Sequence, residues 1–324
     1  MENIDILKDA SAPLAAARFI KEIGRGKDGA RSLSRDDAQL LYAAMLERRV
    51  SDLELGAILL ALRVKGESVE EIGGFLKAAE ASFAALTAPA CNYAPIVIPS
   101  YNGSRRVANL TPLLALLLAR EGAPVLVHGV TQDPGRVTSH EIFEALGCAP
   151  VGDAAGAMAN FQSRQPAFMA IDVLAPKMAR LLAMRRILGV RNSTHTLVKI
   201  IQPFATPALR LTSYTHPEYF AMLSDYFRSE PARGDAFLMR GTEGETVANA
   251  RRAQQIDWFH QGVHTQLVEK QGIVEELPDL PLQNDAAATA SWIRAVLNDE
   301  IPVPAPIADQ VRHCLTVARA LDAA

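Results

Sequence analysis

The sequence predicts an α/β protein in which a small all-α helical domain is followed by a larger α/β domain with a central, mostly parallel sheet. Two observations predict this fold. The first quarter of the chain carries three closely spaced helix-start signals, and the chain after residue 95 alternates short β-branched or apolar runs with helical segments. The first pattern is typical of a compact helical unit, and the second is typical of parallel βαβ units.

Each helix-start signal is a serine followed three residues later by an acidic residue. The pairs are Ser34 with Asp37, Ser51 with Glu54, and Ser68 with Glu71. A serine in this position accepts a hydrogen bond from the backbone of the first turn, so it fixes where a helix begins. The second helix has an apolar stripe formed by Leu55, Ile58, Leu59 and Leu62. Lys65 and Gly66 predict where it ends.

The second part of the chain is expected to hold five strands and six helices. The strands are predicted at Ile96–Ile98, Val125–Val127, Phe168–Ile171, Leu209–Tyr214 and Ala236–Met239. The helices are predicted at Thr111–Glu121, Ser139–Leu146, Pro176–Leu188, Pro217–Phe227, Ala287–Leu297 and Ile307–Leu321. The last two are amphipathic, and we expect them to pack on the sheet.

Composition excludes several classes of protein. A chain of 324 residues with 49% hydrophobic and 21% charged residues can bury a large core. No apolar run approaches the roughly 18 residues of a membrane span, and the N-terminus carries acids where a signal peptide is basic, so we expect a cytoplasmic protein without a membrane partner. Cys91, Cys148 and Cys314 are widely separated, which favours buried free thiols over disulfides or a zinc site.

Charge is unevenly distributed along the chain. The net charge of −3 argues against a protein whose whole surface is built for nucleic acid. However, residues 173–217 contain no Asp or Glu. The basic residues of this stretch are Lys177, Arg180, Arg185, Arg186, Arg191, Lys199 and Arg210. A strip formed by all of these except Arg210 is predicted to face phosphates, and a solvated helix face is the alternative.

Several motifs resemble those of one enzyme family. The segments Leu33–Asp36, Val50–Asp52 and Ala61–Ile72 resemble the helical domain shared by anthranilate phosphoribosyltransferases and pyrimidine nucleoside phosphorylases. His128-Gly129, Phe143–Gly147 and Arg185–Arg191 resemble the anthranilate type. The chain is therefore similar to glycosyltransferase family 3. The resemblance implies a helical domain at residues 1–87, on which a helix near 176–190 packs, and an α/β domain at 88–324.

The resemblance also exposes a difference in the phosphate-binding loop. In active members this loop is rich in glycine and wraps the pyrophosphate of phosphoribosyl pyrophosphate. Here Pro99, Tyr101 and Asn102 replace glycines, although Gly103 is kept. Only glycine lets backbone amides approach a phosphate this closely. The vestigial phosphate-binding residues are Ser100, Asn102, Gly103, Asn109, Thr111, His128, Gly129 and Arg136. They hold a phosphorylated small molecule or, alternatively, only shape the turn from strand to helix.

Three further groups of residues have two interpretations each. Glu243 and Glu245 loosely match the family's metal-binding acidic pair, so they bind Mg²⁺ or form a solvated turn. Arg105 and Arg106 are either phosphate contacts at a helix start or an exposed loop pair. His260 and His264 have the i, i+4 spacing of metal ligands on a helix, but Gly262 between them weakens that helix.

The kept scaffold and altered site resemble the divergent YbiB-type branch of the family. This resemblance implies a homodimer that binds single- or double-stranded DNA or RNA with low sequence specificity through a basic groove. Loss of the glycine loop and the metal pair would remove most of the charge stabilisation that phosphoribosyl transfer requires, so we expect that catalysis is lost. The alternatives are a phosphoribosyltransferase that uses phosphoribosyl pyrophosphate and Mg on an unidentified substrate, and a scaffold that binds protein through its C-terminal helices.

Overall fold

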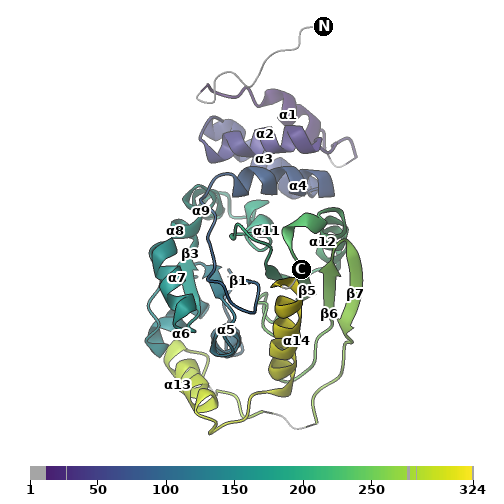
Figure 1. The fold of residues 1–324 in the computed structure, drawn as a ribbon. Coiled ribbons are helices and arrows are strands. Elements are labelled where there is room, and N and C mark those ends of the chain that lie inside the picture. Colours follow the sequence, from purple (N-terminus) through teal and green to yellow (C-terminus); the bar gives the residue numbers. More distant parts are fainter. Residues whose placement is uncertain (1–11, 27, 276–277, 282, 323–324) are drawn as a thin grey trace. The chain divides into compact units, whose positions relative to one another are not determined.

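The computed structural model describes residues 12–26, 28–275, 278–281 and 283–322. The acids on which the signal-peptide expectation depends lie among residues 1–11, outside the described residues. The chain separates into two compact units, and most of their elements are labelled in Figure 1. Unit 1 consists of the described residues up to Phe83 together with Ala175–Ile201, and unit 2 consists of Ala84–Leu174 and the chain from Gln202 onward.

Unit 1 is entirely helical in its described part. Its helices are α1 (Ala17–Ile23), α2 (Arg35–Leu46), α3 (Asp52–Lys65), α4 (Val69–Glu80), α9 (Pro176–Ala183), α10 (Arg185–Leu188) and α11 (Thr194–Leu197). The three predicted helix starts are confirmed, because Ser34, Ser51 and Ser68 each accept a hydrogen bond from the predicted acidic residue's backbone. At the last two the acid also bonds back to the serine amide.

A buried hydrogen bond joins the two chain segments of unit 1, and a buried ion pair lies within the first of them. The Tyr42 hydroxyl lies 2.9 Å from the Thr194 hydroxyl, which joins α2 to α11, and the Tyr42 ring packs 5.2 Å from that of Phe75 on α4. The fully buried Glu71 accepts from Lys65 Nζ at 2.7 Å and from the Leu33 amide at 2.9 Å. A charge buried in this way is stable only because it is paired and hydrogen-bonded.

Unit 2 is built on a seven-stranded sheet of order β3-β2-β1-β4-β5-β6-β7. The strands are β1 (Ile96–Ser100), β2 (Val125–Gly129), β3 (Ala167–Ala170), β4 (Leu209–Tyr214), β5 (Ala236–Arg240), β6 (Ile256–His260) and β7 (Val263–Val268). The first five are parallel, and β6 and β7 are antiparallel. The predicted fold class, a helical domain with a mostly parallel central sheet, is confirmed.

Helices cover both faces of the sheet. Alternate residues such as Ile96 and Ile98 belong to one core with α5 (Thr111–Arg120), α6 (Ser139–Leu146), α13 (Ala286–Leu297) and α14 (Ala305–Asp322). The intervening residues face the other way. There Arg210 is buried, with its guanidinium 5.3 Å from the Phe227 ring of α12 (Pro217–Ser229). The short elements α7 (Ala154–Gln162), α8 (Ile171–Leu174) and η1 (Pro231–Arg233) complete the unit.

The structure corrects three expectations and places His260 and His264. The predicted helix at 176–188 is interrupted at Met184, where i→i+3 bonds replace the α-helical pattern. Ile171 begins α8 and is not part of β3. His260 and His264 lie on the hairpin strands β6 and β7, because Gln261 (φ 48°) and Gly262 (φ 80°) form the tight turn between them. Cys91 and Cys148 are half-buried, and Cys314 is buried.

Candidate functional site

The altered loop leaves the carboxyl end of β1, the edge of a parallel sheet where ligands usually bind. It runs from Tyr101 to the start of α5 at Thr111. Two contacts fix its shape: Ser104 exchanges both backbone hydrogen bonds with Val137, and Arg136 donates to the carbonyl oxygens of Asn102 and Gly103 at 3.3 Å. Arg136 therefore points its guanidinium at the loop backbone.

The backbone conformation and the close packing of the loop require a glycine at position 103. Its φ is +62°, and a Cβ would lie 2.7 Å from the Val137 carbonyl oxygen. The other retained polar residues form a second network: Ser100 Oγ lies 2.7 Å from Ser139 Oγ, which accepts from Asn109 Nδ2 at 3.1 Å. Ser139, which the sequence reasoning missed, thus joins the first residue of α6 to the loop. Its only sequence signal is its place directly after the cap residue Thr138.

Tyr101, which replaces a family glycine, closes over His128. The Tyr101 hydroxyl is 2.7 Å from His128 Nδ1, and the two rings meet edge to face. Burial lowers the pKa of His128 to about 3, so the imidazole is neutral. Burial, followed by the charges of Asp172 and Glu245, raises the pKa of Tyr101 well above its usual value. Both rings are therefore uncharged.

The predicted metal pair lies on the turn that follows β5. Thr242 and Glu245 exchange both backbone hydrogen bonds across Glu243 (φ 52°) and Gly244 (φ 96°), which makes a two-residue type I′ turn. Gly244 packs so tightly on Asn102 that a Cβ at position 244 would lie 2.5 Å from the side-chain nitrogen Nδ2 of Asn102. Asn102 Nδ2 in turn donates to the Gly244 carbonyl oxygen at 2.7 Å.

This turn directs both carboxylates at the amides of the altered loop. Glu245 Oε1 accepts from the backbone amides of Asn102 at 2.8 Å and Gly103 at 2.7 Å. The two oxygens of Glu243 accept from the amides of Arg105 and Arg106, the latter at 2.9 Å. Four backbone donors of the altered loop are thus already bonded to carboxylate oxygens of the same chain.

This arrangement does not fit a magnesium ion. Three of the four carboxylate oxygens accept from backbone amides, and the fourth, Glu245 Oε2, is buried without a hydrogen-bond partner among the described residues, so the pair leaves one oxygen for a metal ion. Mg²⁺ requires a near-octahedral set of oxygen ligands. Within the described residues no three His, Cys, Asp or Glu side chains gather as a metal site. His260 and His264 instead bond to separate carboxylates, Asp235 at 2.9 Å and Asp257 at 2.7 Å.

The predicted basic residues fall into different environments. Lys177, Arg185 and Arg186 are exposed on α9 and α10 of unit 1. Arg180 instead donates to the Met45 carbonyl oxygen, so it joins α9 to the end of α2. Arg191 and Lys199 are half-buried in unit 1. Arg105 and Arg106 are exposed side chains on the loop of unit 2, and their backbone amides are held by Glu243.

Three of the unit 1 cations act on one histidine. Burial, and then the charges of Arg191, Arg185 and Lys199, lower the pKa of His195 to about 4, against an opposing hydrogen bond to Asn192. Burial is the largest cause of this shift, and the smaller contributions of Arg191, Arg185 and Lys199 show that these three cations lie close to His195. His195 was not predicted from the sequence, although it lies inside the acid-free stretch.

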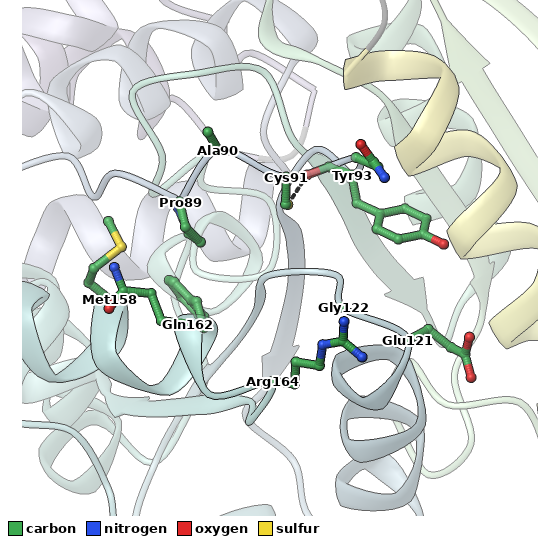
Figure 2. A pocket seen from close by; sticks show the side chains of 11 residues that line it. Pro89, Ala90, Cys91, Tyr93, Glu121, Gly122, Met158, Gln162 and Arg164 are labelled. Atoms are coloured by element: carbon green, nitrogen blue, oxygen red, sulfur yellow. Dashed lines mark hydrogen bonds between the residues drawn. The ribbon is translucent and has the colours of Figure 1, made fainter.

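A cavity of about 710 Å³ lies at the opposite edge of the sheet (Figure 2). Its lining residues include Tyr93, Gly122 and Arg164, which precede β1, β2 and β3 respectively. The half-buried Cys91 also lines it. The cavity is therefore separate from the loop that follows β1. No helix within the described residues is long and apolar enough to cross a membrane.

A helical unit joined to a mostly parallel sheet, with a loop after the first strand whose amides face carboxylates, defines a phosphoribosyltransferase-type fold. Residues 17–82 match the model of the glycosyl transferase family helical bundle domain. YbiB of Escherichia coli K12 is 47% identical over 300 residues, which is 92% of each chain. The anthranilate phosphoribosyltransferase of Persephonella marina is 29% identical over 192 residues, 59% of this chain and 54% of that one.

Two solved structures show the same fold. Anthranilate phosphoribosyltransferase from Thermus thermophilus superposes with a TM-score of 0.71 at 21% identity, over 94% of this chain and 89% of that one. The enzyme from Saccharomyces cerevisiae, in complex with PRPP and Mg, gives a TM-score of 0.67 at 12% identity, over 97% and 96%. The chain belongs to the anthranilate phosphoribosyltransferase-like group of glycosyltransferase family 3, together with YbiB.

Proposed function

We propose that this protein is a cytoplasmic homodimer that binds DNA or RNA with low sequence specificity through basic residues of unit 1, and that it has lost the family's transferase activity. The observation that carries the proposal is the positive region around His195. Arg185, Arg191 and Lys199 act on His195, and they belong to a stretch of 45 residues, 173–217, that contains no Asp or Glu, although the chain as a whole has a net charge of −3. Side chains of this kind contact backbone phosphates, which carry no sequence information.

An exposed apolar face supports the homodimer. On α3, Leu53 is 85% exposed, Leu60 is 50% exposed and Val64 is 71% exposed. Their spacing of seven and four residues puts them on one side of the helix, opposite the buried stripe that includes Leu59 and Leu62. A row of large apolar side chains open to water is typical of a surface that a partner covers. A second copy would also double the number of cations available to nucleic acid.

The hydrogen bonds from the loop amides to Glu243 and Glu245 support the proposed loss of catalysis. Pyrophosphate leaves in the family's reaction, and fixed donors and a metal ion must neutralise its charge. Here the donors face Glu243 and Glu245, and those carboxylates do not form a magnesium site. The alternative is a phosphoribosyltransferase that uses phosphoribosyl pyrophosphate and Mg on another substrate. The retained network of Ser100, Asn109 and Ser139 favours it, as does the yeast relative bound to PRPP and Mg.

Three pairs of consecutive arginines in the sequence allow a matched test of nucleic-acid binding. R185A/R186A removes two exposed cations from α10, R105A/R106A removes two from the loop, and R251A/R252A removes two exposed cations elsewhere in unit 2. We expect fluorescence anisotropy with a mixed-sequence single-stranded DNA to show roughly tenfold or greater weakening for R185A/R186A, because each phosphate contact adds to affinity.

The R251A/R252A variant controls for net charge and should bind as the wild type does. The R105A/R106A variant decides whether the loop contacts phosphates as well. Equal weakening by all three pairs would indicate a general charge effect and would contradict a binding surface on unit 1. Calorimetry with phosphoribosyl pyrophosphate and Mg tests the alternative, and a saturable heat with turnover would favour a transferase.

A further inference from the structure

We propose that the carboxylates of Glu243 and Glu245, on the turn at 241–246, act as an internal anion. They occupy the backbone amides of the altered loop and compete with any phosphate group for them. The proposal rests on the catalytic part of the proposed function, which it deepens by naming what blocks the site. It is carried by four backbone amides, those of Asn102, Gly103, Arg105 and Arg106, which all donate to carboxylate oxygens of Glu243 and Glu245.

The chemistry of the contact is that of an anion site. Two carboxylates present two negative groups to two pairs of loop amides, as the two phosphates of a diphosphate would. Hydrogen bonds from neutral amides to an ionised oxygen are shorter and stronger than those between neutral groups. The Glu245 contacts, at 2.8 and 2.7 Å, are also buried, so water does not compete with them.

The backbone of the turn indicates that this contact is built in. Glu243 has a φ of 52°, a conformation that glycine or asparagine adopts readily and that costs a glutamate free energy. A residue held in such a conformation needs compensating contacts, and Glu243 gains two amide donors from the loop. Gly244 seats the turn against Asn102, and Ser213 Oγ donates to the Gly244 carbonyl oxygen at 2.9 Å.

The orientation of the loop explains why the carboxylates are needed. Arg136 donates to the carbonyl oxygen of Asn102, and because a trans peptide points its C=O and the next residue's N–H in opposite directions, the Gly103 amide faces away from Arg136. Glu245 accepts from this amide and from that of Asn102. Without a bound phosphate, these amides require another acceptor, because a buried donor without a partner is costly. Glu245 supplies that acceptor permanently.

Inorganic pyrophosphate is the probe that tests this proposal. The E243G/E245A variant of the full chain removes both carboxylates, and glycine at 243 suits the positive φ of the turn. We expect isothermal calorimetry to show pyrophosphate binding on the order of tenfold or more tighter than to the wild type. The control is D299G, which, like E243G, replaces an acid at a residue of positive φ (61°) with glycine, in another turn of unit 2. This variant should bind pyrophosphate no better than the wild type does.

Amide hydrogen exchange keeps the test decisive if the double variant folds poorly. In E243G alone, the amides of Arg105 and Arg106 should exchange at least tenfold faster, while those of Asn102 and Gly103 stay protected by Glu245. Unchanged exchange at Arg105 and Arg106, or faster exchange without any gain in pyrophosphate affinity, would overturn the proposal. DNA binding is measured separately through R185A/R186A, so failure of the internal anion and failure of nucleic-acid binding give different results.

Discussion

At the scale of single residues, the altered site is occupied by neutral rings and paired acids. Tyr101 covers His128 with an edge-to-face contact and a 2.7 Å hydrogen bond, and neither ring carries a charge. A buried neutral imidazole contributes to stability in a pH-dependent way. The unfolded chain binds a proton at this histidine below about pH 6.5. The folded protein does so only near a pKa of about 3.

It follows that acid destabilises the fold through His128. As pH falls from 6.5 toward 3, the unfolded state binds the additional proton, so the free energy of unfolding decreases. We expect H128Q to flatten this decrease, because about one fewer proton is bound on unfolding. Urea unfolding at pH 7, 6, 5 and 4 measures the effect, with H216Q at an exposed histidine as the control. Parallel curves for H128Q and the wild type would contradict it.

At the scale of elements, α3 has two different apolar faces. One face is buried within unit 1, and the other carries Leu53, Leu60 and Val64 into solvent. A helix with apolar residues on both sides is suited to lie between its own domain and a partner. The basic helices α9 and α10 also have one cation that packs inward and others that face solvent. Arg180 joins α9 to α2, while Lys177, Arg185 and Arg186 remain exposed.

Charging the exposed face of α3 should separate the protomers. In L60D/V64D, two aspartates would have to be buried at the interface without partners, which is strongly unfavourable. Light scattering after size exclusion should then report the monomer mass, whereas the wild type reports a dimer. V263E serves as the control, because Val263 is 62% exposed but lies on β7 of unit 2. A dimer that survives L60D/V64D would place the interface elsewhere.

At the scale of the whole molecule, a chain of net charge −3 is proposed to bind a polyanion. This requires that the attraction be local, since long-range charge of the same sign as the ligand does not favour association. In a dimer, each protomer would contribute one copy of Lys177, Arg185 and Arg186 to the nucleic-acid contact. The binding should therefore depend steeply on salt and hardly at all on base order.

Six phosphate contacts on duplex DNA predict a slope of about −5 in a plot of log affinity against log salt, or a loss of about 10³-fold between 50 and 200 mM. R185A/R186A removes four contacts from the dimer and should reduce the slope to about −2. Anisotropy titrations at four salt concentrations measure it. A shallow slope in the wild type, or a strong preference among DNA sequences, would argue against binding through phosphate contacts.

Local features of the chain made much of the fold predictable. The starts of α2, α3 and α4 follow from hydrogen bonds between residues three apart, and the five parallel strands follow from short apolar runs between helices. The hairpin of β6 and β7 was not predicted. His260 and His264 have the spacing of a helix, and only the pairing of β6 with β5 and β7 shows that they lie on strands.

By itself the sequence determined the two-part fold and the loss of glycines from the loop after β1, because both depend on residues that are neighbours in the chain. Only the tertiary structure decided what the loop amides bind. Glu245 lies 143 residues from Asn102, and the two meet because parallel strands bring their carboxyl ends to one edge of the sheet. The same holds for Arg180, whose partner Met45 is 135 residues away. Contacts of this range depend on packing, which no local pattern records.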